Sequence, residues 1–110
     1  MSNHHHIELF DFFQSEFVRA LQEFKTNNDS TSRNLAQFMN FTSKNFPILN
    51  AFNLKSTELN STTLQGHYQD KPTNPSFSVS ITIILDFTTQ QFKITWNETL
   101  HTNTDKIVKF

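Results

Sequence analysis

The chain has 110 residues, with nine Lys and Arg side chains against ten Asp and Glu, and a formal net charge of −1 at pH 7. This length suits one compact domain, and the absence of cysteine excludes disulfides, thiolate metal sites and cysteine nucleophiles. The near-neutral charge predicts no general attraction to nucleic acid or to an anionic membrane surface.

The hydrophobic content is low at 35%, but 13 of the residues are phenylalanine. Each buried phenylalanine removes about 150–250 Å² from water, so a few rings can form a core. The single glycine, Gly66, excludes the glycine-rich loops that hold phosphates in nucleotide-binding proteins. The composition therefore predicts an ordered domain with a phenylalanine-rich core.

The N-terminal residues are polar and do not have the pattern of a secretory signal. Met1–His6 is predicted to be a flexible polar leader before a single domain over residues 7–110. The longest apolar run, Ile83–Leu85, has three residues, whereas a membrane helix needs about 20. These features, with the absence of cysteine, favour an intracellular protein of the cytoplasm or nucleus that has no membrane partner.

Helical periodicity dominates the first half of the chain. The spacing predicts a helix over Ile7–Lys25 with an apolar stripe of Phe10, Phe13, Phe17, Leu21 and Phe24, widened by Leu9, Phe12, Val18 and Ala20. A second helix is expected to begin after a cap at Ser30, Thr31 or Ser32 and to reach about Phe46, because Pro47 pushes the preceding residue out of helical geometry. The segment from Ile48 to Phe52 suits either a helical turn or an entry into a sheet.

After Phe52 the hydrophobic period changes to two, which is typical of strands. A hairpin is predicted from Leu54–Leu59 and Thr63–Gln69 around a turn at Asn60-Ser61, followed by a loop over Asp70–Ser76. The strongest strand alternates from Phe77 to Thr88, and two further strands follow, one through Phe92, Ile94 and Trp96 and one over Thr104–Phe110. The predicted fold class is α+β, with two N-terminal helices on a curved antiparallel sheet of four or five strands.

This order of elements resembles the nuclear transport factor 2-like superfamily over most of Phe10–Leu100. The resemblance lies in the long first helix, in the segment Asp86–Trp96, which is similar to a late hairpin of that family, and in the spacing of Asp29, Leu35, Phe38, Met39 and Phe46. A cystatin-like fold, with one helix on a four-stranded sheet, is the competing interpretation. The resemblance implies a cone-shaped domain that often dimerises through its sheet and serves as a scaffold, a ligand pocket or an enzyme.

Two groups of side chains that include histidines are candidates for chemistry. His67, Tyr68 and Asp70, with His101, are the candidate polar groups of a ligand pocket or small active site. His67 and Tyr68 are neighbours in a predicted strand, so their side chains should point to opposite faces. The tract His4-His5-His6 has the ligand type for a transition metal but not the fixed geometry of a real site. We therefore predict no catalytic residues, no metal and no cofactor, and the sequence favours a non-catalytic protein.

The second face of the strongest strand is the most informative surface. Its hydroxyl-rich residues and those of the neighbouring strand are predicted to bind a partner: Ser80, Thr82, Ile84, Lys93 and Thr95. A flat face with little charge favours pairing with another protein surface. The function expected from the sequence is therefore a protein-protein interaction or scaffold module, a homodimer or the binder of another protein. The alternative is a small-ligand pocket protein or small enzyme of the same fold.

Overall fold

The computed structural model describes residues 2–29, 31, 33–57, 60–69, 77–99 and 103–110, with the side chains of residues 2–8, 60 and 61 outside that description. The helical elements are α1 (Ser2–Asn27), α2 (Leu35–Asn45) and the 3₁₀ helix η1 (Pro47–Phe52). The strands are β1 (Lys55–Thr57), β2 (Asn60–Gln69), β3 (Ser78–Asp86), β4 (Gln91–Glu98) and β5 (Asn103–Lys109).

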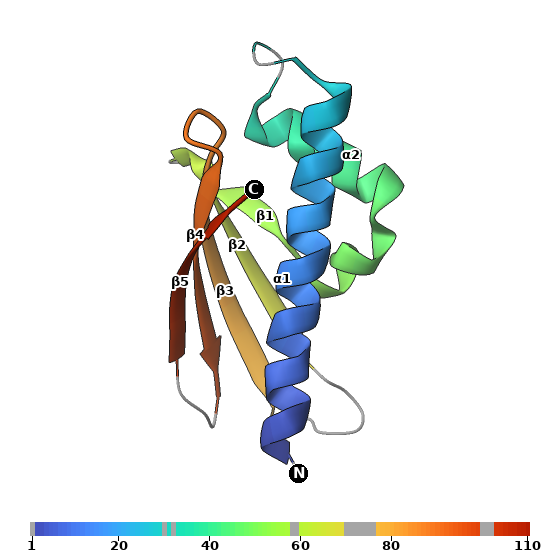
Figure 1. The fold of residues 1–110 in the computed structure, drawn as a ribbon. Coiled ribbons are helices and arrows are strands. Elements are labelled where there is room, and N and C mark those ends of the chain that lie inside the picture. The colour runs from blue at the N-terminus through green and yellow to red at the C-terminus, as the bar shows by residue number, and fades with distance from the viewer. Residues whose placement is uncertain (1, 30, 32, 58–59, 70–76, 100–102) are drawn as a thin grey trace.

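The strands form one antiparallel sheet in the order β1-β2-β3-β4-β5. Figure 1 shows the helices on one side of this sheet, with α1 running along its length. We call the side that carries the helices the inner face and the opposite side the outer face. The predicted α+β class, with two N-terminal helices on an antiparallel sheet, is confirmed.

The core packs aromatic rings together with aliphatic side chains between the helices and the inner face. Phe17 lies at its centre, with its ring centroid 5.0 Å from that of Phe92 on β4 and 5.5 Å from that of Phe38 on α2. Trp96 is buried beside Phe13, and its indole N–H donates a hydrogen bond of 2.8 Å to the Glu98 carboxylate. The predicted phenylalanine-rich core is therefore formed by both helices and the sheet.

Helix α1 begins at Ser2, earlier than the predicted start at Ile7. Its predicted stripe faces the sheet, with Phe13, Phe17, Ala20, Leu21 and Phe24 buried. Phe12, which was expected to widen the stripe, is instead 42% exposed because it falls on the far side of the helix. No helix in the described part of the chain is both long and apolar enough to span a membrane.

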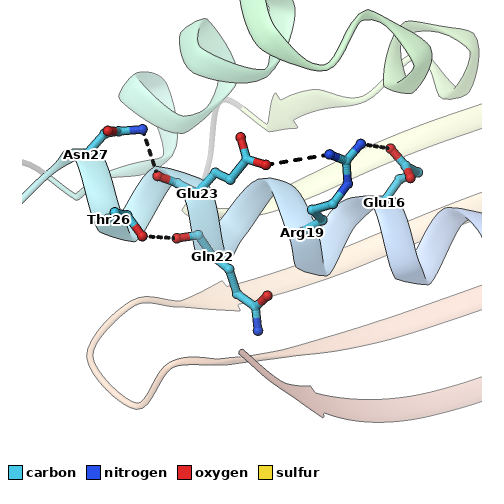
Figure 2. A network of polar contacts seen from close by, with 6 residues as sticks. All are labelled: Glu16, Arg19, Gln22, Glu23, Thr26 and Asn27. Carbon is cyan, nitrogen blue, oxygen red and sulfur yellow. Dashed lines mark hydrogen bonds and ion pairs between the residues drawn. The ribbon is translucent and has the colours of Figure 1, made fainter.

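The polar side of α1 carries local contacts (Figure 2). The Arg19 guanidinium lies 2.9 Å from a Glu16 carboxylate oxygen and 3.6 Å from one of Glu23, and it sits over the Phe46 ring at 4.7 Å. At the end of the helix, Thr26 and Asn27 donate side-chain hydrogen bonds to carbonyls one turn earlier. Exposed ion pairs of this kind contribute little stability, so α1 depends on its buried stripe.

The start of α2 differs from the prediction. The capping side chain is that of Asn34, whose Oδ1 accepts a hydrogen bond of 2.9 Å from the Gln37 backbone N–H. Thr31, one of the predicted caps, instead donates its hydroxyl and its N–H to Asp29. Arg33 donates to the carbonyls of Asn28 and Lys25 at the end of α1. These bonds keep Arg33 outside α2, so the helix begins only after Asn34. The other predicted caps, Ser30 and Ser32, lie outside the described residues.

The first hairpin also differs from the prediction. Asn60 and Ser61, expected as its turn, are the first residues of β2, and Thr57 pairs with Asn60. The pairing register of the two strands shifts between Ser56 and Thr57, which marks a bulge or irregularity in this part of the ladder. The predicted loop over residues 70–76 lies outside the described residues.

Candidate protein-interaction face

The five residues predicted to bind a partner all lie on the outer face. Ser80, Thr82 and Ile84 come from β3, where they alternate with buried side chains of the inner face. Lys93 and Thr95 come from β4, and the register places Lys93 opposite Ile84 and Thr95 opposite Thr82. The two central strands therefore bring the five side chains together in one patch.

Apolar side chains on both sides of Lys93 extend this patch. Ile84 on β3 is 47% exposed, and Ile107 on β5, which pairs with Lys93, is 63% exposed. We call Thr63, Ile84, Lys93 and Ile107, which are paired in succession across β2 to β5, the central row. The predicted patch did not include Ile107. In the structure the neighbouring Val108 is half-buried, so Ile107, next to it in the strand, points to the outer face.

The charges on the outer face have both signs. Lys93 and Lys109 are interspersed with Asp86 and Asp105, and all four are exposed. Polar uncharged side chains, among them Thr82 and Thr95, separate these charges. A face with this pattern presents apolar contacts without a strong net field, which suits contact with a protein rather than with a polyanion.

Asp86 ends β3 and organises the turn to β4. Its Oδ1 accepts hydrogen bonds from the backbone N–H groups of Thr88, at 2.9 Å, and Thr89, at 3.1 Å. Hydrogen bonds from Thr89, the largest cause, and from Thr88 hold the pKa of Asp86 below its ordinary value of 3.8, although desolvation opposes them. The carboxylate therefore has a structural role at the border of the face.

This lowered pKa predicts a pH dependence of stability. Because the folded pKa lies below the unfolded one, the stabilisation is complete above pH 3.8 and is lost as the pH falls through the folded pKa. In Asp86→Asn the amide oxygen can still accept hydrogen bonds, but it does not titrate. Melting temperatures of the two proteins should therefore converge as the pH is lowered below 3.8. A difference in melting temperature between the parent chain and Asp86→Asn that stays constant below pH 3.8 would contradict the lowered pKa of Asp86.

The candidate pocket residues that the structure describes do not converge. His67 is exposed on the outer face opposite Ser80, whereas Tyr68 lies on the inner face, its ring stacked on that of Phe52 at 5.2 Å. The backbone carbonyl of His67 accepts a hydrogen bond of 2.8 Å from the Asn53 side chain. The other two candidates, Asp70 and His101, lie outside the described residues.

A cleft of about 700 Å³ opens where the start of α2 meets the ends of β1, β2 and β3. Ile84 and Asp86 form part of its wall, so the cleft adjoins the outer face. Its main cationic group, Arg33, already donates to two carbonyls at the end of α1, and the Asn34 side chain caps α2. Arg33 and Asn34 therefore support the fold at this cleft.

The tract His4-His5-His6, whose side chains are of a metal-binding type, lies in the first turns of α1. Their side chains are not among those described. Among the residues that the structure does describe, no three His, Cys, Asp or Glu side chains come together as metal ligands would.

The chain was compared with models of protein families, with curated proteins and with solved structures, and none of the three comparisons found a match.

Proposed function

We propose that the chain is a non-catalytic protein-binding module that holds a partner protein on the outer face of its sheet. The observation that carries the proposal is the central row, in which two exposed isoleucines flank Lys93 on the face that the helices leave bare. Ser80, Thr82, Ile84, Lys93 and Thr95 form the centre of the binding surface. The aliphatic stem of Lys93 lies between the two isoleucines and joins them in one apolar row, and such a row with a polar surround is typical of interaction sites.

The proposal includes a relationship to the nuclear transport factor 2-like superfamily. Two helices before an antiparallel sheet, with one sheet face left uncovered, support it. The cystatin-like alternative has one helix and four strands, so the presence of α2 and of five strands favours the first interpretation. Since one fold serves many functions, the binding role depends on the outer face rather than on this relationship.

The small-ligand alternative has weaker support. The space between α1 and the sheet is filled by buried rings, among them Phe13, Phe17 and Trp96. His67 and Tyr68, its described polar groups, point to opposite faces of β2. Screening a metabolite panel by thermal stabilisation tests this alternative, because a ligand that binds only the folded state raises the melting temperature with its concentration.

Arginine on the outer face should abolish partner binding. We expect Ile84→Arg and Thr82→Arg to reduce the amount of captured partner by about tenfold or more, because each places an unpaired charge in the contact. Both positions face away from the core, so the variants should keep the circular dichroism spectrum of the parent protein. The measurement is quantitative affinity capture with the full chain as bait.

Asn40→Arg is the matched control, since Asn40 is an exposed residue of α2 and α2 lies on the side of the sheet away from the outer face. It adds the same charge and should leave capture unchanged. If Ile84→Arg and Thr82→Arg retain the partners that Asn40→Arg retains, the outer face is not the binding surface.

A further inference from the structure

Strand β5 forms one edge of the sheet, and among the described strands it pairs only with β4. The backbone N–H of Phe110, just after β5, donates to the Gln90 carbonyl just before β4. Because backbone groups alternate in direction along an antiparallel strand, Lys109, Ile107 and Asp105 direct theirs away from β4. Such an edge is a template for another strand.

The side chains of the same three residues are arranged to complement a second copy of the chain. Asp105, Ile107 and Lys109 alternate along the outer face of β5, and all three are exposed, with Ile107 63% exposed. Reading the strand in the opposite direction gives a cation, an isoleucine and an anion at the same spacing. An antiparallel copy therefore meets each charge with its opposite.

We propose that two copies of this chain pair antiparallel through β5, with the two-fold axis at Ile107. In this register Ile107 lies opposite Ile107 of the second copy, and Asp105 and Lys109 lie opposite Lys109 and Asp105 of the second copy. The three outward-directed residues become hydrogen-bonded pairs, so the backbone groups of the edge are satisfied along with the charges. The occupant of this edge is therefore a second copy of the chain.

Neighbouring registers are less favourable. With the axis at Lys106, two Lys106 residues would face each other and Asp105 would lie opposite Ile107 of the second copy. With the axis at Asp105 or Lys109, two identical charges would be directly opposed. Like charges in directly opposed positions destabilise a strand pair, whereas opposite charges stabilise it. Of these registers, the order of charges on β5 favours the one with its axis at Ile107.

The inner side of β5 permits this pairing. Lys106 points toward its own helix, where its ammonium donates to the Gln14 side chain at 3.2 Å and lies 5.9 Å from the centre of the Phe10 ring. Its charge is therefore directed over α1 and not toward the edge. Val108, which would lie opposite Lys106 of the second copy, is half-buried on the same inner side.

Pairing at β5 would create one sheet with five strands from each copy. Because Ile107 belongs to the central row, the row would run across the axis into that of the second copy. The outer faces of the two copies would form one continuous surface, twice as wide across the strands as that of one copy. The inference concerns the edge and does not depend on the proposed partner of the face.

The test is the solution mass by light scattering, with charge-exchange variants. The parent chain should have twice the chain mass of 12.9 kDa. Asp105→Lys and Lys109→Asp should each raise the dissociation constant of the dimer about tenfold or more, since each turns two attractive contacts into repulsive ones. An equimolar mixture of the two variants should form a heterodimer with every charge pair restored, and a chain that carries both substitutions should dimerise like the parent.

Lys55→Asp, on the opposite edge strand β1, and Ile84→Arg, on the face, are the controls that should keep the dimer. A parent chain that stays at 12.9 kDa at every concentration would overturn the proposal. So would single variants that remain dimeric, or a mixture that fails to restore the dimer. Because Ile84→Arg affects partner capture and not the dimer, failure of this inference can be told from failure of the proposed function.

Discussion

Replacing Phe17 with alanine is expected to reduce the free energy of unfolding by about 3–5 kcal/mol, the usual cost of removing a buried aromatic ring. The Phe17 side chain is fully buried, and its ring contacts those of Phe13, Phe38 and Phe92. The ring therefore links α1 to both α2 and the sheet. Domains of this size are stable by only about 5–15 kcal/mol, so the variant should unfold at a much lower urea concentration.

Phe12→Ala is the matched control on the same helix. Phe12 is 42% exposed, so the same change removes less buried area and leaves no enclosed cavity, and it should cost about 1–2 kcal/mol. Urea unfolding of both variants measures the difference in the free energy of unfolding. The dependence of this free energy on urea concentration should have the same slope in both variants. Equal losses for Phe12→Ala and Phe17→Ala would mean that the stripe of α1 is not oriented as described.

Gly66→Ala is the second change with a large expected effect, because the backbone of η1 passes close to β2 at this glycine. A Cβ at Gly66 would lie 2.7 Å from the Phe52 carbonyl oxygen and 2.6 Å from a methyl carbon of Leu54. The methyl can move, but the carbonyl belongs to the backbone at the end of η1. Alanine would restrict the unfolded chain and so contribute about 0.4–1 kcal/mol of stability, whereas overpacking typically costs about 1–3 kcal/mol.

The cost of overpacking is therefore larger than the gain from restricting the unfolded chain. We expect Gly66→Ala to have a lower melting temperature than the parent chain. Gln65→Ala, at the exposed neighbouring position on β2, should lie close to the parent. Gly66→Val should lose more than Gly66→Ala because its side chain is larger. A Gly66→Ala variant that is as stable as the parent would show that η1 does not lie against β2 at this point.

Most of the fold could be predicted because hydrophobic spacing is strong where the elements are long. The alternation from Phe77 to Phe87 and the stripe of Phe13, Phe17 and Phe24 placed β3 and α1 correctly. The cap of α2 could not be predicted in the same way. Several polar residues suit a cap, and the choice of Asn34 depends on Arg33 reaching back to carbonyls of α1. That contact is tertiary and leaves no periodic signal.

The candidate face was predictable in part. Strand alternation alone places Ser80, Thr82 and Ile84 on one side of β3. The contribution of Ile107 depends on the pairing of β5 with β4, which local sequence does not specify. The opposite orientations of His67 and Tyr68 followed from their adjacency in a strand, whereas the turn placed at Asn60-Ser61 missed the irregular register between β1 and β2.

Photo-crosslinking from the outer face tests the proposed function most directly. A photoreactive phenylalanine analogue would replace Ser80, which is exposed on β3, or Asn40, which is exposed on α2, in cells that express the full chain. We predict a discrete crosslinked protein from position 80 that is absent from position 40 and is lost when Ile84→Arg is added. The same products from both positions, or no product from position 80, would contradict the assignment of the outer face as the binding surface.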